Sequence, residues 1–154
     1  MRILMVCLGN ICRSSIAEGV LKYKVKKLGL NWIVDSAGTE SYHIGQAPHR
    51  FSQKICLVHG IDISTQCARR FTPADLQQYD KIYAMAEDVY DEMKQIAGPG
   101  TDMSRIELFL NELHPGKNED MPDPYYGGEA GFTVVYDMID KTCDAIIEKY
   151  RDKV

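Results

Sequence analysis

Short apolar runs alternate along this chain with longer segments in which apolar residues recur at helical spacing. Residues 2–6 form the first run, which stops shortly before Gly9, as a buried strand of a parallel sheet does. Similar short runs follow at residues 32–36, 81–85 and 106–110. The pattern therefore predicts about four strands.

The segments between these runs have the periodicity of amphipathic helices. The first helix is predicted from Ser14, with Ser14 or Ser15 as its N-cap, and it ends at Gly29. Three further helices are predicted at residues 48–59, 87–97 and 130–150. This alternation predicts a three-layer α/β fold, in which a central parallel sheet of about four strands, in flavodoxin-like order, carries helices on both faces.

Composition and charge narrow the possible functions. The 154 residues are 45% hydrophobic and contain no repeat or linker, so we expect one domain over residues 1–154. The net charge of -4 gives no broad cationic surface, so neither nucleic acid nor a membrane is an expected partner. The apolar start of the chain is too short for a signal peptide, and the five irregularly spaced cysteines suit reduced thiols. We therefore expect a cytoplasmic protein.

Folds of this class bind ligands at the carboxyl ends of their strands, so the turn between the first strand and the first helix is the first place to expect a functional site. It has the sequence Cys7-Leu8-Gly9-Asn10-Ile11-Cys12-Arg13-Ser14. A loop that curls around a tetrahedral anion directs its backbone N–H groups inward, and the following helix adds its N-terminal donors. The spacing of Cys7 and Arg13 lets the thiol and the forked guanidinium meet at one phosphate. Gly9 allows the tight path, and Asn10 tolerates left-handed dihedral angles.

Cys7 is the candidate nucleophile of this loop. Only the thiolate attacks, and the loop amides, the helix N-terminus and Arg13 each favour that anion. The Ser14 hydroxyl can donate a hydrogen bond to it. A small apolar residue at the end of a buried strand is the alternative interpretation, but a strand, a loop with this Cys–Arg spacing and a helix in succession favour catalysis.

The loop sequence V-C-L-G-N-I-C-R-S, together with D-P-Y-Y at residues 123–126, resembles the low-molecular-weight protein tyrosine phosphatase family. Further matching segments, in the family's order, lie at residues 35–39, 68–72 and 106–108 and in the closing helix. The resemblance implies hydrolysis of phosphotyrosine and small aryl phosphates through a phosphocysteine on Cys7. It makes Arg13 the phosphate clamp and Asp123 the general acid. Ser15 departs from the proline usual in the family, and serine also suits a helix start.

Asp123 has a chemical reason to act as both acid and base. Departure of a tyrosyl oxyanion needs a proton, and attack of water on phosphocysteine needs that proton removed. Pro124 favours an extended backbone at Asp123 and stiffens its loop. A solvated turn before Gly127 and Gly128 explains the same residues equally well from sequence chemistry alone, and the family resemblance favours the catalytic role.

The resemblance also assigns the residues that contact the substrate. The phosphate is expected to bind the loop residues Leu8, Gly9, Asn10, Ile11, Cys12 and Ser14. Tyr125 and Tyr126 are expected to form one wall of a slot for the phosphotyrosyl ring, and Tyr42 the facing wall. Ordinary surface or core packing is the alternative for all three tyrosines.

Several residues near the loop have supporting roles by the same resemblance. Ser36 and Asn10 resemble the family's hydrogen-bond network that holds the loop, and Gln66 stands where many members have histidine. A glutamine amide still hydrogen-bonds, so we expect altered loop rigidity or pH response with activity retained. For Cys12 the resemblance suggests a reversible disulfide with Cys7, and a small filler beneath the loop is the alternative.

No metal or cofactor is expected, because no metal-site spacing relates the cysteines to the histidines His43, His49, His59 and His114. Two other activities would use the same loop. A thioredoxin-coupled arsenate reductase needs two downstream cysteines as a disulfide relay, which Cys56 and Cys67 fit poorly. A phosphocysteine carrier or phosphotyrosine-binding module would suppress attack by water. The expected partners are phosphotyrosine-containing proteins and phosphate or other oxyanions, and the expected state is a monomer.

Overall fold

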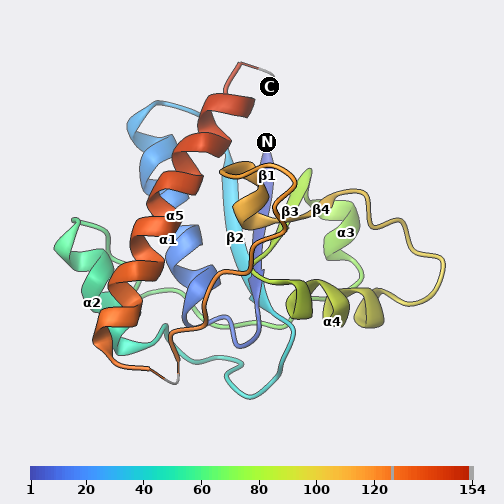
Figure 1. The fold of residues 1–154 in the computed structure, drawn as a ribbon, viewed down its shortest axis with the longest axis horizontal. Coiled ribbons are helices and arrows are strands. Elements are labelled where there is room, and N and C mark those ends of the chain that lie inside the picture. The colour runs from blue at the N-terminus through green and yellow to red at the C-terminus, as the bar shows by residue number, and fades with distance from the viewer. Residues whose placement is uncertain (126, 153–154) are drawn as a thin grey trace.

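A parallel four-stranded sheet lies at the centre of the computed structural model, which describes residues 1–125 and 127–152 (Figure 1). The strands are β1 (Arg2–Cys7), β2 (Ile33–Gly38), β3 (Lys81–Ala84) and β4 (Ile106–Leu108), in the order β2-β1-β3-β4. Each neighbouring pair is parallel. This is the flavodoxin-like order, so the predicted fold class is confirmed.

Helices cover both faces of the sheet (Figure 1). On one side lie α1 (Arg13–Lys27), α2 (Arg50–Val58) and α5 (Glu129–Tyr150), and on the other lie α3 (Asp75–Gln78) and α4 (Glu87–Ala97). Alternate residues of β1 serve the two layers: Ile3 and Met5 join the core beneath α1 and α5, whereas Val6 faces the α3 and α4 side. Such two-sided burial explains why the strands are continuous apolar runs.

The structure differs from the prediction in a few elements. The strand expected over residues 106–110 ends at Leu108, and the chain turns into a short 3-10 helix, η1 (Phe109–Glu112). This turn brings the Phe109 ring edge-on to Tyr83, with the ring centroids 5.8 Å apart. The helix α3 was not predicted, because four residues are too few to show a helical period.

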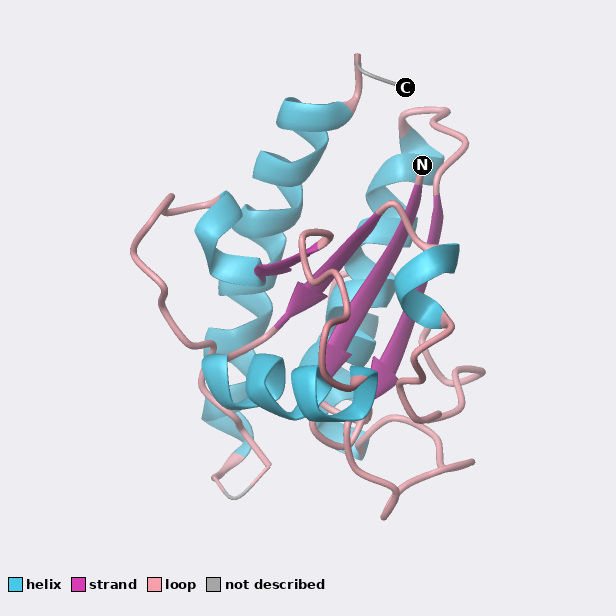
Figure 2. Cartoon of the chain, turned by 90° about the vertical axis from the view of Figure 1, so that its right-hand side faces the viewer, coloured by secondary structure: helices cyan, strands magenta, loops and turns pink. Residues whose placement is uncertain are grey.

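The carboxyl ends of the strands meet at one edge of the sheet, and the loops that follow them gather there (Figure 2). Cys7 ends β1 opposite Gly38, which ends β2. A Cβ atom at Gly38 would lie 2.5 Å from the Leu8 carbonyl oxygen, so only glycine allows β2 to lie this close to the loop after β1. Among the described residues, no helix is long and apolar enough to cross a membrane.

Candidate active site

A pocket opens where the loop after β1 enters α1. Cys7 lies at its inner end, and the side chain is buried. The Cys7 Sγ atom is 2.9 Å from the Ser14 hydroxyl oxygen. The described residues that line the pocket come from three separate segments of the chain: Cys7, Leu8, Gly9, Ile11, Cys12, Arg13, Glu40, His43, Asp123 and Tyr125.

The start of α1 differs from the sequence prediction. The N-cap is Cys12, without a side-chain capping bond, so the prediction of Ser14 or Ser15 as the cap is wrong. Both serines lie inside the first helical turn. The Ser15 hydroxyl donates back to the Cys12 carbonyl at 2.8 Å, while the Ser14 hydroxyl faces Cys7. The serines therefore brace the loop instead of capping the helix.

Asn10 holds the loop in a left-handed conformation, with φ at 60°. Its side-chain amide donates to the Ser14 hydroxyl at 2.9 Å and to the Ser36 hydroxyl at 2.8 Å. Its side-chain carbonyl accepts the backbone N–H of Arg69 at 3.0 Å. Asparagine tolerates this conformation better than most residues, and three hydrogen bonds fix it here. Ser36 and Asn10 are therefore brought together as expected.

Arg13 is buried in the same pocket as Cys7, and the Nη edge of its guanidinium points toward the third segment of the pocket. Nη1 donates to the Met121 carbonyl at 3.0 Å, and Nη2 lies 3.5 Å from the Asp123 carboxylate. Its Nε atom is buried and has no hydrogen-bond partner among the described residues. An unpaired buried donor is costly, and an oxyanion in the pocket is a chemically suitable acceptor for it.

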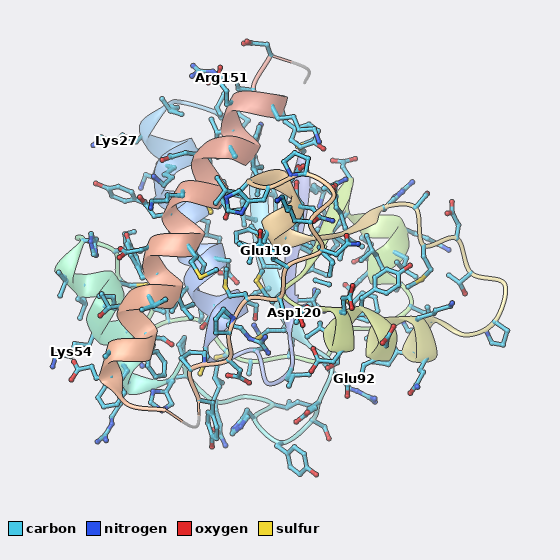
Figure 3. All side chains as sticks on the ribbon, viewed as in Figure 1. Lys27, Lys54, Glu92, Glu119, Asp120 and Arg151 are labelled. Atoms are coloured by element: carbon cyan, nitrogen blue, oxygen red, sulfur yellow. The ribbon has the colours of Figure 1, made fainter. Side chains whose placement is uncertain are left out.

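The loop that carries Asp123 is anchored at its base. Met121 is buried, and its N–H donates to the Met85 carbonyl at 2.9 Å. Asp120, labelled near α4 in Figure 3, accepts the N–H of Glu87 at 2.8 Å. The Asp123 carboxylate in turn accepts the N–H of Tyr125 at 3.0 Å. These contacts hold the carboxyl at the pocket without burying it.

The aromatic residues are arranged differently from the expectation. Tyr125 lines the pocket and is 39% exposed. Tyr42 is 81% exposed and is not among the described residues that line the pocket. His43 stands there instead, with its ring centroid 5.7 Å from that of Tyr125. Tyr126 lies outside the described residues.

Cys12 and Gln66 have surroundings that bear on their predicted roles. Burial, and then the charges of Cys7 and Asp123, raise the pKa of Cys12 to about 12. The structure contains Cys7 and Cys12 as free thiols. Gln66 donates to the Ser15 carbonyl at 3.2 Å. The glutamine therefore braces the first turn of α1, and among the described residues its side-chain amide bonds to Ser15 and to neither Asn10 nor Ser36.

Four residues in or next to the site were not predicted from the sequence. Glu40 and His43 line the pocket, the Arg69 N–H donates to Asn10, and Glu18 accepts the Ser36 hydroxyl. Glu40 and His43 belong to an irregular loop, where no periodicity indicates which side chain faces the pocket. Arg69 contributes through its backbone, to which its side-chain type gives no clue. Glu18 did carry a signal, because it lies one helical turn after Ser14, and residues four apart share a helix face. In the described part of the chain, no group of three or more His, Cys, Asp or Glu could hold a metal ion.

The chain is similar to known proteins over nearly its whole length. A family model described as low molecular weight phosphotyrosine protein phosphatase matches residues 2–154. The protein of that name from Gallus gallus is 39% identical over 150 residues, which cover 96% of this chain and 94% of that protein. The crystal structure of YfkJ from Bacillus subtilis matches with a TM-score of 0.91 at 33% identity, covering 99% of this chain and 96% of that one. Wzb from Vibrio vulnificus, solved in complex with benzylphosphonate, matches with a TM-score of 0.85 at 29% identity, covering 96% and 97%.

Proposed function

The chain belongs to the low-molecular-weight phosphotyrosine protein phosphatase family, and from this premise we propose that it hydrolyses phosphotyrosine in proteins through a phosphocysteine on Cys7. One observation carries the proposal. The thiol of Cys7, the guanidinium of Arg13 and the carboxyl of Asp123 line a single pocket. A nucleophile, an anion clamp and a proton donor are what this chemistry requires.

In the first step, the Cys7 sulfur attacks the phosphorus atom. The S–P bond forms while the bond from phosphorus to the tyrosyl oxygen breaks, and Asp123 gives its proton to that oxygen. The Ser14 hydroxyl, 2.9 Å from the sulfur, stabilises the thiolate before attack. Hydrogen bonds to an anion are among the stronger ones in proteins.

In the second step, a water molecule takes the place of the departed tyrosine. Asp123, now a carboxylate, accepts a proton from the water as its oxygen attacks phosphorus. The S–P bond breaks, inorganic phosphate leaves, and the Cys7 thiolate and the Asp123 acid are restored. No cofactor takes part in either step.

Arg13 and the loop amides bind the phosphoryl oxygens throughout. Charge on these oxygens is spread in the transition state of phosphoryl transfer, and fixed donors stabilise it without reorganisation. The Nε of Arg13, which has no hydrogen-bond partner among the described residues, supplies one such donor. Leu8, Gly9, Asn10, Ile11, Cys12 and Ser14 supply the rest of the phosphate-binding loop in this proposal.

Trapping of the intermediate tests the proposal most directly. During turnover of p-nitrophenyl phosphate, rapid acid quench followed by peptide mass spectrometry should find one phosphoryl adduct, and it should map to Cys7. An adduct on another side chain would overturn the mechanism. A stoichiometric Cys7 adduct without steady release of phosphate would support a phosphocarrier instead.

The arsenate reductase alternative is not favoured. A relay needs a second cysteine that can attack the first, yet Cys56 is fully buried, and burial raises its pKa to about 12. Cys67 is exposed and is not among the described pocket residues. The presence of Asp123 and Tyr125 in the pocket suits an aryl leaving group better than arsenate.

His43, rather than Tyr42, is expected to contribute to binding of the aryl ring. Replacing His43 by alanine removes the ring beside Tyr125, and KM for p-nitrophenyl phosphate should rise roughly 3- to 10-fold with kcat little changed. The matched variant Tyr42→Ala should leave KM nearly unchanged for this small substrate. Steady-state kinetics of both variants decide the point. A larger rise in KM for Tyr42→Ala than for His43→Ala would support Tyr42 as the facing wall.

We further propose that the chain acts as one domain, as a monomer and in the cytoplasm. The free state of its five cysteines supports a reducing compartment. Its exposed large apolar side chains are spread over several elements, which supports the monomer. Light scattering after size exclusion would test that state, and a mass of twice 17.4 kDa would contradict it.

A further inference from the structure

Glu18 is an acidic side chain enclosed in the layer between α1 and the sheet. It is only 7% exposed. One carboxylate oxygen accepts the Ser36 hydroxyl at 2.6 Å, and the other accepts the Lys22 ammonium at 2.7 Å. Carboxylates are seldom buried unless they are paired. The pairing explains how Glu18 is tolerated, and the bond to Ser36 connects it to the phosphate loop.

The direction of each hydrogen bond beyond Ser36 follows from the donors available. The backbone N–H of Arg69 can only donate, so the Asn10 oxygen faces it. The Asn10 nitrogen therefore supplies the two remaining bonds, to Ser36 at 2.8 Å and to Ser14 at 2.9 Å. The side-chain orientation of Asn10 is fixed by this arrangement.

Ser36 has a single hydroxyl proton, and Glu18 determines where it points. A carboxylate is an acceptor only, so the proton of Ser36 is directed to Glu18, and its oxygen lone pairs are left for Asn10. Consecutive bonds of this kind polarise one another and strengthen each member. Glu18 therefore makes Ser36 a better acceptor for the Asn10 amide.

The chain of bonds ends at the sulfur. The Ser14 oxygen accepts from Asn10, so its own proton is free for one acceptor. The Cys7 sulfur lies at 2.9 Å, whereas the alternative, the Ala37 carbonyl, lies at 3.5 Å. The sulfur is the nearer acceptor, and as a thiolate it is the stronger one because it is charged.

We infer that Glu18 is a positioning residue for the nucleophile: its carboxylate orients Ser36, Ser36 holds Asn10, and Asn10 directs the Ser14 hydroxyl to the Cys7 sulfur. The inference rests on the proposed function, because it assigns a role in preparing that thiolate. Gln66 donates to the Ser15 carbonyl, and Ser36 donates its hydroxyl proton to Glu18. Glu18 also lines a surface hollow between α1 and the loop that contains residues 60–66. Among the described residues, the other charged groups that line this hollow are Lys22, Lys26 and Asp62.

The variant Glu18→Ala tests the inference through the pH dependence of kcat/KM. At slightly acidic pH the thiolate depends on the Ser14 hydrogen bond, so kcat/KM for p-nitrophenyl phosphate should fall roughly 3- to 10-fold relative to wild type. At mildly alkaline pH the ratio of variant to wild type should recover, because bulk base then ionises the thiol. The rate at which iodoacetamide alkylates Cys7 should show the same pattern. The conservative variant Glu18→Gln keeps an acceptor oxygen for Ser36 and should restore most of the activity.

Two further variants separate positioning from general destabilisation. Lys24 lies on the same helix and pairs with Asp140 and Asp144 of α5, so Lys24→Ala loosens α1 without touching the chain of bonds. It should leave the pH profile unchanged. In a Ser36→Ala background, Glu18→Ala should add almost nothing, because the route to Cys7 through Ser36 has been removed.

The outcomes are distinguishable from failure of the proposed function. If wild type shows no turnover, or Cys7→Ser retains it, the proposed function fails. If wild type turns over and Glu18→Ala matches it at every pH, the inference alone fails. It fails equally if Glu18→Ala loses activity by the same factor at all pH values, or if the losses from Glu18→Ala and Ser36→Ala multiply.

Discussion

Replacing Cys7 by serine is expected to lower turnover of p-nitrophenyl phosphate by roughly four orders of magnitude or more. The serine hydroxyl fits the space of the thiol and can still hydrogen-bond Ser14, so the pocket should keep its shape. At neutral pH, however, a hydroxyl ionises far less than a thiol and attacks phosphorus far more slowly. Steady-state release of p-nitrophenol measures the effect, and circular dichroism with a thermal melt checks the fold.

The matched control is Cys67→Ser. Cys67 is exposed and lies outside the described pocket residues, so this variant should turn over at the wild-type rate. Alkylation gives an independent check. Iodoacetamide at neutral pH should modify Cys7 before Cys12, because burial raises the pKa of Cys12 to about 12 and keeps that thiol protonated. Substantial turnover by Cys7→Ser would disprove covalent catalysis at this residue.

Replacing Asp123 by asparagine is expected to lower kcat/KM, which reports the steps up to departure of the leaving group, by about 100-fold or more for phenyl phosphate. Phenolate is a poor leaving group without a proton, whereas nitrophenolate departs readily, so the loss should be clearly smaller for p-nitrophenyl phosphate. Asparagine can still accept the N–H of Tyr125, which the aspartate accepts at 3.0 Å, so the loop should stay in place. Plotting log(kcat/KM) against leaving-group basicity should give a steeper slope for the variant.

Asp120→Asn serves as the control for this experiment. Asp120 accepts the N–H of Glu87, an acceptor role that asparagine preserves, and it is not among the described pocket residues. The variant should keep the wild-type slope. A loss of kcat/KM in Asp123→Asn that is equal for all leaving groups would mean that Asp123 shapes the loop without protonating the leaving group.

The regular elements of the fold were predictable, because burial on both faces makes the strands of this sheet apolar throughout. The exceptions have local causes. Phe109 and Leu110 are as apolar as a strand, yet they form a turn of 3-10 helix because Phe109 packs on Tyr83. Apolar residues alone do not distinguish these two conformations over so few positions. Similarly, Ser14 and Ser15 are good capping residues by type, but their hydroxyls are used by the phosphate loop.

The candidate site was predictable where spacing along the chain determines geometry. Cys7 and Arg13 bracket one tight loop, so their presence in one pocket follows from the sequence. The placement of Asp123 came from the family resemblance, since its loop reaches the pocket only through tertiary contacts such as that of Met121 with Met85. His43 lines the pocket where Tyr42 was expected. Which of the two does so depends on the path of an irregular loop, and no periodic pattern specifies that path.

Arg13 joins two parts of the enzyme that are far apart in sequence. One nitrogen is held by the Met121 carbonyl, at the root of the segment that presents Asp123, and another lies near the Asp123 carboxylate. In the proposed mechanism, shortening this side chain would release the segment that carries Asp123, the proposed proton donor, and would also weaken phosphate binding. Substitutions at Arg13 and at Asp123 therefore disturb the same contact. The loss of transition-state stabilisation in the double variant should be smaller than the sum of the losses in the two single variants.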